Sequence, residues 1–137
     1  MKLFTSLLFI CLFTFTSFSQ KAEFKFEKET IDYGKIYSGT DGTRTFVFTN
    51  VGKEPLIITR VQSSCGCTVP KKPEQPIMPG EKGEIKVSYD TKRIGGFSKI
   101  ITIYSNAKNE HKTVKIKGYI KKKQTSPEKE KSLLSNS

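Results

Sequence analysis

Runs in which apolar and polar residues alternate one by one constrain the fold of this 137-residue chain more than any other feature. In one run Ile85, Val87 and Tyr89 alternate with polar residues, and in another Val114 and Ile116 alternate with lysines. Successive side chains of a β-strand point to opposite faces, so this period of two predicts strands with one buried and one wet face. No window of a dozen residues shows a clean helical repeat of apolar positions.

Seven such runs are predicted as strands, separated by turns rich in Gly, Pro, Asn and Asp. They cover residues 23–27, 31–37, 43–50, 55–62, 83–90, 97–105 and 111–121. Seven short strands in about 100 residues is the count of an immunoglobulin-like domain. The sequence therefore predicts an all-β fold, an immunoglobulin-like antiparallel β-sandwich of about seven strands. A small closed barrel is the alternative, because it would show a similar alternation.

The first 19 residues have the layout of a secretory signal peptide. Lys2 supplies a positive start, Leu3 to Phe18 is apolar or hydroxylated throughout, and Ser17 and Ser19 occupy the small-residue positions before a cleavage site. We expect cleavage after Ser19, with an uncleaved anchor as the alternative. The protein is then exported, to the periplasm, the cell surface or the medium, with no transmembrane span after cleavage.

The remaining chain is predicted to hold one domain and a tail. Residues 20–121 contain all seven predicted strands and the turns between them. Their length suits a single small domain. Residues 122–137 have lost the alternation and are rich in Lys, Glu and Ser. Such a composition buries too little apolar area to offset the entropy of ordering, so we expect a disordered tail.

Loss of residues 1–19 would leave two cysteines, Cys65 and Cys67, in an oxidising compartment. Residues two apart in an extended strand lie ~6.6 Å apart, whereas the Cβ atoms of a disulfide lie ~3.8 Å apart. An intrachain bond therefore requires the backbone to fold up at Gly66. The small ring would be strained and a poor structural staple.

Three interpretations of this cysteine pair stay open. The first is a structural or interface disulfide, which includes a bond between two chains. The second is thiol-redox chemistry, favoured by the positive charge of nearby lysines. The third is a clamp for a soft metal ion such as Cu(I), to which Met78 could add a thioether. Zinc requires about four ligands, and His111 is the single histidine, which we expect to be solvated.

The formal net charge is +11, from 24 Lys and Arg against 13 Asp and Glu. Only three of these cations are Arg, the residue that makes bidentate contacts to bases, so we expect no nucleic-acid partner. Lysines concentrated near the end of the predicted domain form a candidate basic patch for anionic polysaccharide or lipid head groups. Its members are Lys112, Lys115, Lys117, Lys121, Lys122 and Lys123. The alternative is a solvated strand face.

Patterns typical of catalysis are absent from the sequence. One histidine, no G-x-S-x-G elbow and no phosphate-binding glycine loop give no constellation for turnover. We expect no catalytic residues, no resident metal and no cofactor.

Three segments resemble a known family: residues 50–58 (NVGKEPLII), 64–70 (SCGCTVP) and 77–85 (IMPGEKGEI), preceded by 31–36 (IDYGKI). They are similar to a large family of exported bacterial proteins of unknown function, whose members look like hydin-type and major-sperm-protein-like sandwiches. The resemblance spans about residues 24 to 120, and its most specific part is the Cys-Gly-Cys-Thr-x-Pro element. It implies an immunoglobulin-like fold and export, and it implies no catalytic residues.

We therefore predict an exported, non-catalytic binding or structural module of the cell envelope. Its partner is expected to be a protein or envelope polysaccharide, contacted through loops or by strand addition at a sheet edge. The alternative function is a thiol-redox or Cu(I)-binding protein that acts through Cys65 and Cys67.

Overall fold

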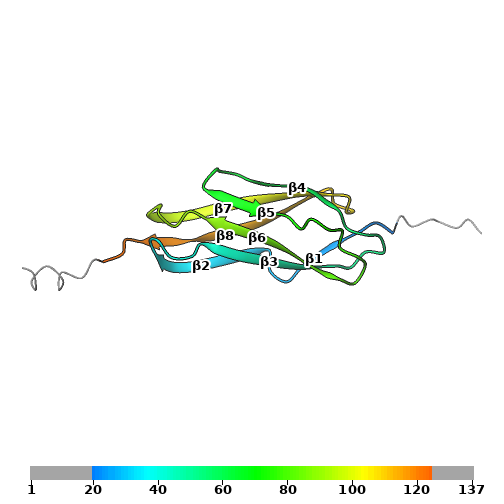
Figure 1. Cartoon of the computed structure of the whole chain (residues 1–137), viewed down its shortest axis with the longest axis horizontal. Helices are drawn as coiled ribbons and strands as arrows, with labels where there is room; N and C mark the ends of the chain where they lie inside the picture. Colours follow the sequence, from blue (N-terminus) through cyan, green and yellow to red (C-terminus); the bar gives the residue numbers. More distant parts are fainter. Residues whose placement is uncertain (1–19, 125–137) are drawn as a thin grey trace, which may run out of the picture.

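The computed structural model describes residues 20–124, in which all the regular secondary structure is β-strand. Eight strands form two four-stranded sheets that lie face to face (Figure 1). Sheet A has the strand order β1-β3-β6-β5, and sheet B has the order β2-β8-β7-β4. The strands are β1 (Phe24–Phe26), β2 (Thr30–Tyr37), β3 (Thr43–Asn50), β4 (Ile58–Ser63), β5 (Thr68–Lys71), β6 (Lys82–Tyr89), β7 (Gly95–Ser105) and β8 (His111–Lys121).

The predicted immunoglobulin-like sandwich is confirmed, and the barrel alternative is wrong because the two sheets have separate edges. Three details differ from the prediction. Strand β5 was not expected, the predicted strand at 55–62 begins only at Ile58, and β2 pairs with β8 in parallel rather than antiparallel orientation. The segment before β4 contributes one isolated bridge, in which Leu56 and Ile77 exchange main-chain hydrogen bonds of 2.8 and 2.9 Å.

The core lies between the sheets and contains the alternating residues that the sequence singled out. Ile85 and Val87 of β6 and Val114 and Ile116 of β8 are buried in this core, and the polar residues that alternate with them are exposed. Burial of each large apolar side chain contributes roughly 1.5–3 kcal/mol. The alternation therefore fixes which face of each strand turns inward.

A cluster of aromatic rings fills the end of the sandwich near the β6–β7 turn. The rings of Tyr89 and Phe97 stack with centroids 3.8 Å apart, and Tyr33 meets Phe97 edge-on at 5.2 Å. The Tyr33 hydroxyl donates a 2.7 Å hydrogen bond to the carbonyl oxygen of Gly42. Desolvation by burial raises the pKa of Tyr33 to about 12, against the smaller lowering effect of the Arg44 guanidinium above its ring.

At the opposite end of the sandwich, the buried side-chain amide of Asn50 joins neighbouring loops through hydrogen bonds. Its Nδ2 donates to the carbonyl oxygens of Glu54 (2.8 Å) and Ile77 (2.9 Å), and its Oδ1 accepts from the amide of Gly52 (3.0 Å). A buried side-chain amide with its donors and acceptor satisfied stabilises the loops that it joins.

The domain is elongated, and the first and last described residues lie at opposite ends of its long axis (Figure 1). Strand β8 ends at Lys121 and the next three residues continue without regular structure. The predicted leader and all but the first three residues of the predicted tail lie outside the described residues. Within residues 20–124 there is no helix of the length and apolarity that crossing a membrane requires.

Candidate functional site

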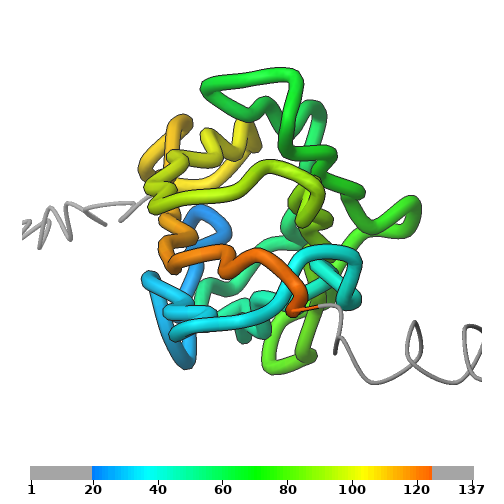
Figure 2. The backbone as a smooth tube through the Cα atoms, turned by 90° about the vertical axis from the view of Figure 1, so that its left-hand side faces the viewer, coloured from blue at the N-terminus to red at the C-terminus, as the bar shows by residue number. Residues whose placement is uncertain are grey.

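The cysteine pair lies where the chain crosses from sheet B to sheet A, between β4 and β5 (the green loop at the top of Figure 2). Before it, the amide of Ser64 donates to the carbonyl of Ile100 (3.0 Å), which extends the β4–β7 ladder by one residue. After it, the amide of Asp90 donates to the carbonyl of Cys67 (2.9 Å), where the β5–β6 ladder begins. Both flanks of the crossing are thus held by main-chain hydrogen bonds.

Cys65 and Cys67 are joined by an intrachain disulfide, with their Cα atoms 5.4 Å apart. The backbone turns at Gly66, as the sequence spacing requires, and the amide of Thr68 donates to the carbonyl of Cys65 (3.4 Å). The amide of Cys67 also donates to the Sγ atom of Cys65 (3.2 Å), and the Thr68 hydroxyl lies 3.8 Å from each sulfur. Both cysteines are half-buried, and Gly66 between them is exposed.

The additional metal ligands considered from the sequence do not join this pair. Met78 directly follows Ile77, which bridges to Leu56 ahead of β4, whereas the cysteines follow the end of β4. His111 is exposed and meets the ring of Tyr104 edge-on at 4.8 Å, near the start of β4. In residues 20–124 no three His, Cys, Asp or Glu side chains are grouped so that they could hold a metal ion.

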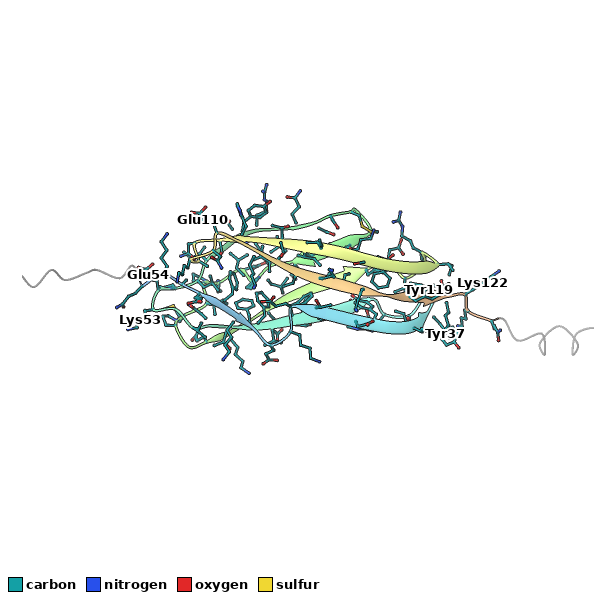
Figure 3. The ribbon with its side chains drawn as sticks, turned by 180° about the vertical axis from the view of Figure 1, so that it is seen from behind. Tyr37, Lys53, Glu54, Glu110, Tyr119 and Lys122 are labelled. Carbon is teal, nitrogen blue, oxygen red and sulfur yellow. A yellow bond between two sulfur atoms is a disulfide. The ribbon has the colours of Figure 1, made fainter. Side chains whose placement is uncertain are left out.

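The six lysines of the candidate patch are spread along β8 and beyond its end rather than gathered in one place. Lys112 pairs with Glu29, and Lys117 pairs with Asp32 at 3.7 Å. Lys115, Lys117 and Lys121 share the outward face of sheet B, whereas Lys112 has the opposite, inward parity. Lys122 lies past the strand, at the same end of the domain as the exposed Tyr37 and Tyr119 (Figure 3), and Lys123 and Gln124 lie beside residues 37–40 in a shallow pocket.

Strand β4 forms an edge of sheet B, and its unpaired side is a feature that the sequence did not identify. In an antiparallel ladder, every second residue of a strand exchanges main-chain hydrogen bonds with its partner strand. Ser64 bonds to Ile100, so Gln62 and Arg60 are the residues of β4 that bond to β7. Strand β4 is the last strand of sheet B, so the amides and carbonyls of Val61 and Ser63 point away from β7 toward no neighbouring strand, and residues 20–124 show no main-chain bond to them from outside the ladders. They form a short row of free donors and acceptors.

The other three edges are less open. Strand β1 has three residues, and β2 is interrupted by a register shift between Asp32 and Lys35, where Gly34 has a φ of 64°. On β5 the main-chain groups directed away from β6 are those of Thr68, whose amide is already bonded to Cys65, and of Pro70, which has no amide hydrogen. Prolines, bulges and short strands are the usual means of blocking an edge, so β4 is the edge left available for pairing.

Taken together, the fold and the site define an immunoglobulin-like sandwich domain with one open edge strand that leads into a disulfide between near neighbours. Residues 24–120 match the family described as "Protein of unknown function (DUF1573)", and the chain belongs to this family. No curated protein shows significant similarity to it.

Solved structures share the fold at low sequence identity. A protein of unknown function from Porphyromonas gingivalis W83 has a TM-score of 0.66 and 18% identity; the match covers 79% of this chain and 51% of that one, so this chain spans about half of its length. The PapD-like domain 7 of human CEP192 has a TM-score of 0.59 and 8% identity, over 77% of this chain and 88% of that domain.

The YadV chaperone has a TM-score of 0.55 and 12% identity, over 80% of this chain and 58% of that one. An MSP family member from C. elegans, WR4, is also similar, with a TM-score of 0.46 and 12% identity over 74% of this chain and 99% of that one. At identities this low, the three likenesses with TM-scores above 0.5 show the sandwich fold alone.

Proposed function

We propose that this domain is an exported binding module of the cell envelope, which takes up an extended segment of a partner protein by strand addition along β4. The observation that carries the proposal is the row of free main-chain groups at Val61 and Ser63, on the edge that has no proline and a regular ladder from Arg60 onward. Export is inferred from the leader-like composition of residues 1–19.

Side chains at this edge support an apolar component of binding. The half-buried side chains of Val61 and Cys67 pack against the core cluster from its border. A segment paired with β4 would place every second side chain over this border. We therefore expect a partner segment in which alternate residues are apolar, with main-chain hydrogen bonds of about 1 kcal/mol each adding sequence-independent affinity.

The structural neighbours support a binding role for the fold without naming a partner. YadV is a chaperone, and its fold is similar to that of this domain. Sandwiches of this kind host many functions, so the edge geometry rather than the likeness is the argument for binding.

The test is site-specific photo-crosslinking in the native host, with the photoreactive residue at Gln62 on β4 or at Glu84 on the outer face of the central strand β6. We expect a discrete adduct from position 62, whose crosslinked peptide maps to one extended segment, and none from position 84. A synthetic peptide of that segment should then slow hydrogen exchange at the amides of Val61 and Ser63.

Two variants at one position provide the matched control. Ser63→Pro removes the outward amide hydrogen without touching the bonds to β7, and should abolish the adduct. Ser63→Ala keeps that amide and removes only the hydroxyl, which accepts from the amide of Cys65 at 3.3 Å, so the adduct should persist. Equal labelling from positions 62 and 84, or an adduct that survives Ser63→Pro, contradicts strand addition at β4.

A further inference from the structure

We propose that the Cys65–Cys67 disulfide is a chemically reactive group, which oxidises a dithiol of a protein client by thiol–disulfide exchange. This activity goes beyond the binding function proposed above and does not depend on it. It is inferred from four properties of the pair: its small contribution to the fold, its accessibility, the hydrogen-bond donors around its sulfurs and the difference between its two sulfurs.

The bond adds little to the stability of the fold because the bonded residues are only two positions apart. A disulfide stabilises mainly by restricting the unfolded chain, and this restriction is small for so short a loop. The crossing itself is held on both sides by main-chain bonds, from Ser64 to Ile100 and from Asp90 to Cys67. The folded domain should therefore persist when the pair is reduced.

An attacking thiol can reach the pair from solvent. Both cysteines are half-buried and keep part of their surface in solvent, and a Cβ atom placed on Gly66 would have no heavy atom within 4 Å outside its chain neighbours. The pair therefore lies at an open tip of the crossing. Accessibility of this kind separates reactive disulfides from buried structural ones.

Hydrogen-bond donors near the sulfurs can stabilise a thiolate leaving group. The sulfurs of a disulfide carry no hydrogen, so in the contacts of 3.8 Å the Thr68 hydroxyl is the donor. This hydroxyl belongs to a buried side chain and can turn toward either sulfur. A hydrogen bond to the charged form of an acid lowers its pKa, which makes it a better leaving group.

The two sulfurs are not equivalent, because Cys65 accepts one additional hydrogen bond. The amide of Cys67 donates to the Sγ atom of Cys65 at 3.2 Å, and there is no corresponding amide donor to the Sγ atom of Cys67 within residues 20–124. Cys65 is therefore the better leaving group. The geometry directs the attack of a client thiolate to the Sγ atom of Cys67.

The exchange balances without another reactant. A client thiolate forms a bond to the sulfur of Cys67, the electron pair of the old disulfide bond departs on Cys65, and that thiolate takes a proton from water. The second client thiol loses its proton to water and attacks the client sulfur of the mixed disulfide. The bond to Cys67 breaks, and Cys67 leaves as a thiolate. The client dithiol is oxidised by two electrons to a disulfide, and the pair is reduced to two thiols.

The first experiment mixes the oxidised protein without residues 1–19, which carry the third cysteine, Cys11, with a reduced synthetic peptide that contains two cysteines, under anaerobic conditions. We expect one peptide disulfide per protein molecule, two new protein thiols by thiol counting, and an unchanged far-ultraviolet circular dichroism spectrum. The variant in which both cysteines are serine is the matched control and should form none. Absence of transfer, or loss of the fold on reduction, overturns the proposal.

The second experiment compares the two thiols one at a time. The pH dependence of alkylation is measured for Cys65 in Cys67→Ser and for Cys67 in Cys65→Ser. We expect the midpoint for Cys65 to be lower by about one pH unit, the size expected from one hydrogen bond to a charged acceptor. A midpoint for Cys67 at or below that of Cys65 overturns the assigned direction of attack.

The role of the hydroxyl is tested by Thr68→Val, which keeps the shape of the side chain. The rate of peptide oxidation should fall several-fold while the circular dichroism spectrum stays the same; an unchanged rate shows that the hydroxyl does not assist departure of the thiolate. Failure of exchange is separable from failure of strand addition, because crosslinking from position 62 should persist in the double-serine variant.

Discussion

At the scale of single residues, Gly118 is an inward position of β8 at which the packing leaves no room for a side chain. It lies between two buried isoleucines of this strand, facing the aromatic cluster. A Cβ atom at this position would lie 2.7 Å from the Cβ of Tyr33 and 3.0 Å from the ring of Phe97. The Cβ of Tyr33 is fixed to the backbone, and the ring of Phe97 is held by its stacking on Tyr89, so neither can move aside easily and the packing of the two rings requires a glycine here.

We therefore predict that Gly118→Ala lowers the free energy of unfolding by about 1–3 kcal/mol, the usual cost of overpacking a core. Gly96→Ala is the matched control, because its Cβ would lie at an ordinary 3.6 Å from the Tyr119 ring on the outer face of the same sheet. This control should be neutral or slightly stabilising, since alanine is favoured over glycine within a strand. Urea denaturation distinguishes the two, and an equal effect of both variants would contradict the packing argument.

At the scale of elements, the sequence predicted the strands that alternate and missed the one that does not. Strand β6 alternates strictly between exposed and buried residues, so both its location and its buried face were predictable. Strand β5 has four residues, one of them Pro70, and its inward positions are Thr and Pro rather than large apolar residues. Its strand conformation follows from pairing with β6, which a local pattern does not encode.

Of the candidate site, the cysteines were identified from the sequence and the open edge of β4 was not. The sequence singled out Cys65 and Cys67 and placed the turn that a bond would need at Gly66, but it left an intrachain disulfide open among three interpretations, and the bond is shown by the structure. The open edge at Val61 and Ser63 was not predictable, because the order of strands in each sheet decides which main-chain groups stay free. For the same reason the parallel pairing of β2 with β8 has no signal in the alternation.

Pro70 gives an element-scale prediction, because it denies β5 an outward amide hydrogen. Pro70→Thr restores that donor, and with the free carbonyls already present the β5 edge should pair with a second copy. We expect concentration-dependent dimers by sedimentation velocity. Val69→Thr is the control, because the main-chain groups of residue 69 are directed toward Ser88 and its side chain is 66% exposed. A Pro70→Thr variant that associates no more than the unaltered protein, or equal association of both variants, would show that the proline is not what blocks this edge.

At the scale of the whole molecule, the parallel pairing of β2 and β8 affects how the domain resists tension, because the two ends of the domain lie at opposite ends of its long axis. Tension applied outward at Gln20 and Gln124 draws β2 and β8 past each other along their length (Figure 1). The hydrogen bonds of their ladder then share the load and must break together. Tension that separates two strands from one end breaks such bonds one after another.

We predict that handles attached at Gln20 and Gln124 give a high unfolding force in single-molecule pulling. Handles at Ser38 and Lys122, which lie together at the same end of β2 and β8, should open the ladder at a much lower force, because the amide of Ser38 bonds to Lys121 at this end. Equal forces in the two geometries would contradict this view. Shear loading would make the domain a stiff link, able to keep its shape while something pulls on both of its ends.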